Sequence, residues 1–457
     1  MVNQKRLDHR ILQILIPAIM ENALLTLSDM ILTGYIGRLS VSQISAYGIS
    51  SRIYGIYFAV FKGFAIGTMV IFARAFGAGD RRKAASLYKQ ATGIAVPVAL
   101  AAAIIIWLIP ETLLFSMSDD PSLLTVGASY LKINVLTYPL LALIHLNSAA
   151  FQADGNTKTP LYIATIGNAV SIVLGYVLII GIGSYGGLGL TGAAITANIR
   201  IIVMAVVGLW LLFGNGVMFA QYKDVHMEMS VQSFKELVGF GIPTAIGNSF
   251  WNIAAVFLST YILSYGQENY AAYQLGLQAE GFCDMMAAGF MTAAMSLAGK
   301  AIGAKDKEMY HQSYGRLNYY CLVISGINMV FLLLFSKPVL YLLTDKQNLV
   351  EIAHVYLLLM VFSQYPEMKS KVTYGFIRSA GYGTTPTVID MIGIWGVRVF
   401  GCYLISMVFH LDIVWIWWII NADQWVRCLL SMAVCRVKRI IYLLEESGNE
   451  QIESCHI

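Results

Sequence analysis

The chain has 457 residues, of which 58% are hydrophobic and only 12% are charged, and its mean hydropathy is +0.66. A soluble protein carries about 25% charged residues, so a single water-soluble core is excluded and an all-α integral membrane protein is expected. The formal net charge is +4, and the basic residues lie between apolar segments rather than in a stripe, which excludes a nucleic-acid partner.

The N-terminal segment begins with Lys5, Arg6 and Arg10 and continues as an apolar run over residues 11–36. A secretory signal has a shorter apolar region followed by a cleavage site of small residues. No Ala-x-Ala pattern follows this run, so we interpret it as an uncleaved first membrane helix.

About twelve segments are long and apolar enough to cross the roughly 30 Å hydrocarbon core of a bilayer. The predicted spans are 11–36, 44–73, 87–109, 123–148, 160–183, 191–213, 235–264, 269–299, 312–342, 349–378, 385–409 and 412–435. They predict a six-helix lobe over 1–213, a cytoplasmic linker over 214–234, a second six-helix lobe over 235–435 and a cytoplasmic tail over 436–457.

Lysine and arginine concentrate in alternate loops, and such loops face the cytoplasm in membrane proteins. The basic loop residues include Arg74, Arg81, Arg82, Lys83, Lys300, Lys305, Lys307, Arg436, Lys438 and Arg439. We therefore expect a multi-pass protein of the cell membrane with both termini in the cytoplasm. The expected partners are the lipid bilayer, a small-molecule substrate and a coupling cation, and the expected state is a monomer.

The two halves repeat each other. Pro17 and Pro243 are 226 positions apart (243 minus 17), as are Asn22 and Asn248. The same offset links Ala46-Tyr47 to Ala272-Tyr273, Gly77-Ala78-x-Asp80 to Gly303-Ala304-x-Asp306, and Thr159-Pro160 to Thr385-Pro386, with a one-residue slip near Pro139 and Pro366. An even number of spans gives both halves the same orientation. Duplicated halves of this kind favour a transporter, although channels also use symmetry.

Three motifs resemble the MATE (multidrug and toxic compound extrusion) family of the MOP flippase superfamily. They are Pro17-x-x-x-Glu21-Asn22, Gly77-Ala78-Gly79-Asp80, and Arg378-x-x-Gly381-x-x-Thr384-x-Pro386 followed by Gly393-x-Trp395-x-x-Arg398. The resemblance covers residues 8–435. It implies a twelve-helix, two-lobe exporter of bulky, usually cationic compounds, driven by Na⁺ or H⁺.

Ionisable side chains inside a membrane are costly and therefore mark functional sites. Four acids are candidates for cation coupling: Glu280, Asp284, Asp29 and Glu367. Glu280 and Asp284 are four residues apart and share a helix face, so mutual repulsion favours a bound proton or cation. Glu280, Asp29 and Glu367 also resemble acids of MATE helices, with Asp29 one turn before the position that the family pattern gives.

Two departures from the family leave the choice between H⁺ and Na⁺ open. Some members carry an Asn and an Asp in the fifth helix where this chain has Ser171 and Gly175, and others carry an acid in the seventh helix where it has Trp251. No other cofactor and no bound metal are expected.

Polar and aromatic residues of the spans are candidates for a substrate cavity. They are Asn22, Tyr54, Asn248, Trp251, Gln278 and Asp390. Lys62, Lys369 and Lys371 also lie within apolar spans. These lysines either form ion pairs, for example Lys371 with Glu367, and reach toward the membrane surface, or they line a cavity for anionic or zwitterionic substrates.

Catalytic motifs are missing from the sequence: it has no Gly-x4-Gly-Lys-Ser/Thr, no His-Glu-x-x-His and no Gly-x-Ser-x-Gly. We therefore expect no catalytic residues and no enzyme. The predicted function is export of drugs or metabolites, chiefly organic cations, by antiport with H⁺ or Na⁺. The alternative is a flippase for lipid-linked precursors or other amphiphiles, and a membrane sensor or enzyme is a third, weaker hypothesis.

Overall fold

The computed structural model describes residues 2–115, 120–182, 186–214, 218–222 and 231–446. The first half contains α1 (Val2–Ile36), α2 (Val41–Gly77), α3 (Arg81–Leu108), α4 (Pro110–Phe115), α5 (Pro121–Asn134), η1 (Val135–Thr137), α6 (Tyr138–Ala153), α7 (Lys158–Gly175), η2 (Tyr176–Ile180), α8 (Leu190–Phe213) and η3 (Ala220–Tyr222).

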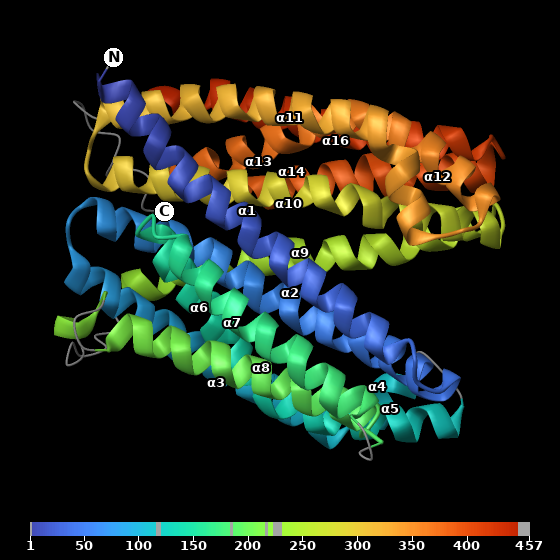
Figure 1. Cartoon of the computed structure of the whole chain (residues 1–457). Coiled ribbons are helices and arrows are strands. Elements are labelled where there is room, and N and C mark those ends of the chain that lie inside the picture. The colour runs from blue at the N-terminus through green and yellow to red at the C-terminus, as the bar shows by residue number, and fades with distance from the viewer. Residues whose placement is uncertain (1, 116–119, 183–185, 215–217, 223–230, 447–457) are drawn as a thin grey trace. The chain divides into compact units, whose positions relative to one another are not determined.

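The second half contains α9 (Val231–Leu263), α10 (Gln267–Gly303), α11 (Lys307–Leu343), α12 (Gln347–Met360), η4 (Val361–Ser363), α13 (Gln364–Ser379), α14 (Thr385–Met391), η5 (Ile392–Val399), α15 (Phe400–Tyr403), η6 (Leu404–Val408), α16 (Ile413–Val437), η7 (Ile440–Tyr442) and α17 (Leu443–Glu446). The long helices of each half lie side by side as bundles (Figure 1).

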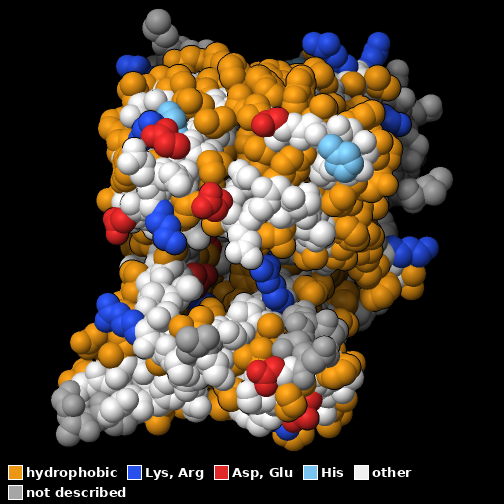
Figure 2. Space-filling model, turned by 90° about the vertical axis from the view of Figure 1, so that its right-hand side faces the viewer, with side chains coloured by type: hydrophobic (Ala, Val, Ile, Leu, Met, Phe, Trp, Pro, Cys, Tyr) orange, Lys and Arg blue, Asp and Glu red, His pale blue; other side chains and the backbone are white. Residues whose placement is uncertain are grey.

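The predicted all-α membrane class is confirmed. Eleven helices of the described chain are long and apolar enough to cross a membrane. The twelfth predicted span corresponds to α16, whose middle carries Asp423, Gln424 and Arg427 and is therefore less apolar. Hydrophobic side chains cover much of the face in Figure 2, where charged side chains form separate small groups.

The repeat extends to local details of the helices. Asp80 caps α3 by accepting a hydrogen bond from the Lys83 amide at 2.8 Å, and Asp306 caps α11 in the same way at 2.9 Å. The 3₁₀ turns η1 and η4 begin at Val135 and Val361, again 226 positions apart (361 minus 135). The two copies therefore share backbone geometry as well as hydrophobic pattern.

Two tyrosine pairs repeat as well. The rings of Tyr47 and Tyr130 meet edge to face at 5.8 Å, and those of Tyr273 and Tyr356 meet edge to face at 5.5 Å. Both members of the first pair become the members of the second on adding 226. Equivalent positions in the two halves can therefore be compared side chain by side chain.

The chain forms two compact units. The first unit comprises Met20–Ala245, and the second comprises Met1–Ile19 with Ile246–Ile457. Each of α1 and α9 thus contributes its beginning to one unit and its remainder to the other. The two points of division, after Ile19 and after Ala245, also differ by 226 (245 minus 19).

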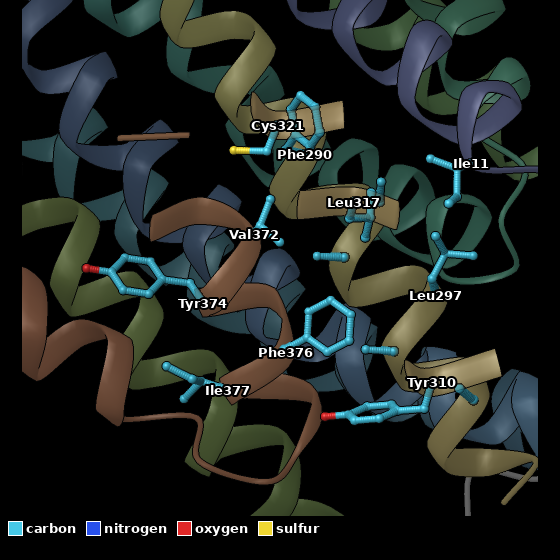
Figure 3. Close-up of a cluster of buried hydrophobic side chains, with 14 of the residues drawn as sticks. Ile11, Phe290, Leu297, Tyr310, Leu317, Cys321, Val372, Tyr374, Phe376 and Ile377 are labelled. Carbon is cyan, nitrogen blue, oxygen red and sulfur yellow. The ribbon is translucent and has the colours of Figure 1, made fainter. Parts of the chain in front are cut away.

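The beginning of α1 is built into the core of the second unit. Ile11 is fully buried in a cluster with Phe290, Leu297 and Leu317. Figure 3 shows Ile11 on the same side of this cluster as Leu297, with Tyr310 and Phe376 further along it. Because the apolar side chains at the beginning of α1 are buried against those of α10, α11 and α13, this segment of α1 belongs to the second unit.

The beginning of α9 has the corresponding place in the first unit. A side-chain carbon on Gly67 of α2 would lie 2.2 Å from the carbonyl oxygen of Phe240, so only glycine permits this approach of the two backbones. Leu237, which the repeat relates to Ile11, is likewise fully buried. Each unit is therefore completed by the first turns of a helix that continues into the other.

Candidate cation-coupling site

Three carboxyl groups meet in the second unit. Glu280 and Asp284 lie on α10 and Glu367 lies near the start of α13, and their nearest ligand oxygens are all within 4.8 Å of one another. We call these residues the acid cluster. Carboxylate oxygens are the ligands that hard cations prefer, and the same groups also accept protons.

Two contacts hold the acid cluster in place. The Tyr356 hydroxyl donates a hydrogen bond to Oε2 of Glu280. The ring of Tyr356 lies close against α10 because position 276 is glycine, where an added side-chain carbon would be 2.4 Å from Tyr356 Cδ1. The carboxyl oxygens of Asp284 and Glu367 lie within 4.8 Å of each other, so a negative charge on one disfavours a negative charge on the other.

Electrostatic repulsion explains why the acid cluster needs a positive partner. Two unit charges 4.8 Å apart repel by about 3 kcal/mol at an effective dielectric constant of about 20. Three ionised carboxylates would accumulate this cost over three pairs. A proton or a cation bound among them removes most of it, so the geometry favours loading by positive charge.

A buried network of arginines and aspartates adjoins the acid cluster. Asp423 is fully buried and accepts bonds from Arg398 at 2.7 Å and from Arg427 through two nitrogens at 3.0 Å each. Arg427 also reaches Asp390 at 3.2 Å. We call these four residues the arginine network. Arg398 acts electrostatically on Glu280, so the arginine network and the acid cluster interact through their charges.

Local backbone structure makes room for the arginine network. Arg398 is carried by the π-helical segment η5, and Gly393 stands in the same segment. A side-chain carbon on Gly393 would lie 2.3 Å from Arg427 Cγ and 2.4 Å from Asp423 Oδ1. Wide helical turns of this kind are frequent at functional sites. Here the segment carries Arg398, and its glycine leaves space for the ion pair between Asp423 and Arg427.

Similarity to known proteins identifies the family. The sequence profile of the MatE family matches residues 17–177 and, a second time, residues 243–404. The chain belongs to the MatE family. The double match confirms both the internal repeat and the resemblance inferred from the motifs.

Relatives and solved structures agree with this membership. A probable multidrug resistance protein NorM of Thermotoga maritima is 23% identical over 92% of this chain and 90% of its own. A probable multidrug resistance protein YoeA of Bacillus subtilis is also 23% identical, over 88% of each chain. A MATE protein solved in complex with MaL6 has the same fold, with a TM-score of 0.88 at 18% identity, covering 96% of this chain and 97% of its own.

Membership establishes the general activity. The family consists of multidrug efflux transporters, so this MatE member is a multi-pass membrane transporter.

The four predicted coupling acids do not come together in one unit. Glu280, Asp284 and Glu367 meet in the acid cluster of the second unit, whereas Asp29 belongs to the first unit. There Asp29 forms a 2.8 Å ion pair with Arg200 of α8. Asp29 therefore has an arginine in direct contact, whereas no ion pair of this kind is described for the three members of the acid cluster.

The suggested ion pair between Lys371 and Glu367 does not form in the part of the chain that the structure describes. The carboxyl group of Glu367 instead lies within 4.8 Å of those of Asp284 and Glu280, and Lys371 acts electrostatically on Asp284. A spacing of four residues permits the pair, but the Glu367 carboxyl group belongs to the acid cluster with the two acids of α10. Lys369 contacts Asn318 and Tyr314 of α11.

The predicted substrate-cavity residues fall in both units. Asn22 and Tyr54 belong to the first unit, and Asn248, Trp251, Gln278 and Asp390 belong to the second. Asp390 accepts bonds from Tyr374 at 2.9 Å and from Arg427, which makes it a member of the arginine network. Trp251 is half exposed at 49% and has no ring partner among the described aromatic residues.

Sequence reasoning missed three residues that shape these sites. Arg427 stands four residues after Asp423, a spacing that indicates a helix ion pair. Arg200 is the one basic residue in the span 191–213, and a lone charge in an apolar span is the signal by which it could have been singled out. Tyr356 carried no comparable signal, because a tyrosine in an apolar helix is ordinary.

Proposed function

We propose that this MatE transporter exports drugs or metabolites that carry a positively charged group, across the cell membrane, in exchange for H⁺ or Na⁺. The acid cluster is the observation that supports coupling. It gathers three carboxyl groups on two helices of the second unit, where a proton or a hard cation relieves their repulsion.

The arginine network gives the coupling ion a route to influence the substrate. Arg398 is shared between Asp423 and Glu280, and Arg427 acts on Glu367 as well as on Asp390. Loading the acid cluster weakens its hold on both arginines and strengthens their hold on the aspartates. Asp390 is 23% exposed and so remains available to a positively charged group of the substrate. Binding of ion and substrate is therefore linked and opposed, as exchange requires.

Transport by purified protein in liposomes tests this proposal. We expect efflux of a fluorescent organic cation such as ethidium to respond to an imposed pH gradient or Na⁺ gradient. Glu280→Gln, Asp284→Asn and Glu367→Gln should each abolish that response. Glu268→Gln is the matched control, because Glu268 lies exposed in the first turn of the same helix α10. A full gradient response in all three cluster variants would refute the site.

A vesicle assay with a fluorescent short-chain lipid separates the flippase alternative. Movement of that lipid between leaflets, without any gradient-dependent movement of ethidium, would replace the antiport proposal. A response of ethidium efflux to neither gradient would likewise reject coupling.

A further inference from the structure

One buried arginine of the second unit, Arg378, forms no ion pair in the part of the chain that the structure describes. It lies in the last turn of α13 and is only 5% exposed. Its Nη1 donates to the sulfur of Met291 on α10 at 3.4 Å, and its Nε has no hydrogen-bond partner among the described residues. A thioether is a weak acceptor, and a buried charge without a partner is costly. Any arrangement that brings an anionic group to Arg378 is therefore favoured.

The internal repeat explains why Arg378 lacks an anionic partner. The helices α6 and α13 begin and end 226 positions apart (364 minus 138 and 379 minus 153), so Arg378 occupies the position of Gln152 (378 minus 152). In the first unit Gln152 donates a hydrogen bond to Glu21 Oε2 at 2.9 Å. The position equivalent to Glu21 is Gly247 (247 minus 21), which has no side chain. The second unit thus has the stronger donor at this place without the acid that a donor holds in the first.

Asp390 of α14 is the carboxyl group that lies near Arg378. Tyr374 precedes Arg378 by four residues, so the two side chains share a face of α13, and the Tyr374 hydroxyl donates to Asp390 Oδ1 at 2.9 Å. Asp390 and Arg378 also act on each other electrostatically. Arg427 of α16 donates to the same Oδ1 at 3.2 Å. Because both bonds end on Oδ1, the Oδ2 atom of Asp390 can accept from a further donor.

From this arrangement we propose that Arg378 is the alternative partner of Asp390 and competes for it with the positively charged group of the substrate. This inference rests on the proposed function, in which Asp390 receives that group. When the acid cluster is unloaded, Glu367 attracts Arg427 away from Asp390. The carboxylate then passes to Arg378 or to a cation that enters from outside.

Competition of this kind determines which compounds are accepted. A neutral compound offers Asp390 no charge in place of the guanidinium, so Arg378 restricts the site to substrates with a positive group. The guanidinium also gives Asp390 a counter-charge while no substrate is bound. Substrate affinity is lowered accordingly, because only the molecules in which Arg378 has released Asp390 are competent to bind.

Equilibrium binding of ethidium to the full-length protein in lipid nanodiscs, followed by fluorescence anisotropy in alkaline buffer without Na⁺, tests the inference. Arg378→Gln is expected to bind ethidium at least about fivefold more tightly than the unaltered protein, which is the lower end of the coupling between linked sites. Arg378→Lys keeps the positive charge and should bind like the unaltered protein. Arg436→Gln removes an exposed arginine of α16 and is the matched control for net charge, so it should change nothing. Unchanged or weaker ethidium binding by folded Arg378→Gln would overturn the proposal.

A folding defect does not imitate this result, because a misfolded protein does not bind its substrate more tightly. Arg378→Met is a second variant, of similar length and suited to apolar surroundings, and should show the same gain of affinity. Size-exclusion chromatography identifies which of the two elutes as a folded species. Absence of the gain in the folded variant would refute the competition.

Asp390→Asn identifies the acid through which Arg378 acts. This substitution alone should weaken ethidium binding, and adding Arg378→Gln to it should have no further effect. A full gain of affinity without the Asp390 carboxylate would show that Arg378 acts elsewhere and would overturn the proposal.

The ionic conditions provide a signature that a merely structural role of Arg378 would not produce. Asp390 is faced by Tyr374 and Arg378 from α13 and by Arg427 from α16, and Arg427 is held in turn by Asp423. In mildly acidic buffer with Na⁺ the acid cluster is loaded and Arg427 stays on Asp390, so Arg378→Gln should then bind ethidium nearly like the unaltered protein. An equal gain of affinity under both conditions would contradict the proposed competition.

The two proposals fail separately. Ethidium efflux that follows an ion gradient, together with weakened binding by Asp390→Asn and unchanged binding by Arg378→Gln, would reject the role of Arg378 and leave the proposed function intact. A gain of affinity in Arg378→Gln that depends on Asp390, together with efflux that follows neither gradient, would reject ion coupling and support the competition.

Discussion

Replacing Gly393 by alanine should break the arginine network from within. The new side-chain carbon would lie 2.3 Å from Arg427 Cγ and 2.4 Å from Asp423 Oδ1, whereas ordinary contacts begin at 3.4 Å. The ion pair must therefore move by about 1 Å. Asp423 is fully buried and loses at least one of its three arginine bonds. Disrupting a buried ion pair costs about 3–5 kcal/mol, so we expect destabilisation of about 3 kcal/mol.

Thermal unfolding in detergent micelles, followed by size-exclusion chromatography, measures this effect. Gly396→Ala is the matched control, since Gly396 lies in the same η5 segment and an added carbon there meets nothing within 4 Å. Alanine replaces glycine in a helix with a gain of up to about 1 kcal/mol, so the control should unfold at the same temperature or higher. Equal unfolding temperatures for the two variants would refute the tight packing of the network. Normal ethidium efflux by Gly393→Ala would refute its role in coupling.

Three further substitutions test the framework. Gly276→Ala places a carbon 2.4 Å from Tyr356 Cδ1 and should lower both stability, by about 1–3 kcal/mol, and gradient-driven efflux, whereas Gly281→Ala on the same helix meets nothing within 4 Å and should do neither. Tyr356→Phe keeps the ring but removes the hydroxyl that reaches the acid cluster, so it should reduce efflux while costing only about 1 kcal/mol of unfolding free energy. Gly67→Ala puts a carbon 2.2 Å from a backbone carbonyl of α9 and should lower the unfolding temperature, with Gly55→Ala as the unhindered control on α2.

The hydrophobic pattern was sufficient to predict the helices and their duplication. Apolar runs of about 20 residues match the thickness of the bilayer and so predict membrane helices. The fixed offset that links Pro17 to Pro243 predicts that the two halves share backbone geometry. The same logic brought Glu280 and Asp284 onto one helix face. Glu367 was predicted through its likeness to a family acid, and the structure brings it to the other two.

Side-chain pairs between helices that are far apart in the chain could not be predicted from the sequence. Asp29 and Arg200 are separated by 171 positions, and no local spacing indicates that their helices meet. The resemblance to a family acid suggested coupling for Asp29, whereas its arginine partner gives it a different electrostatic setting. The acid cluster could be predicted in part because two of its members lie on one helix, α10. The Asp29–Arg200 pair could not be predicted because its members lie on two helices, α1 and α8.

The sequence also could not predict that the beginnings of α1 and α9 each pack in the unit formed by the other half. The repeat is the same whether or not each half packs against its own first helical turns. That exchange has a historical consequence. Chains that trade an identical segment form closed symmetric pairs, and here residues 1–19 and the start of α9 are traded at equivalent points. A six-helix precursor built this way would have functioned as an intertwined homodimer before its gene was duplicated and joined. Once the copies are joined, each can change without the other: the second unit holds a cluster of three acids, whereas the first holds an ion pair between Asp29 and Arg200.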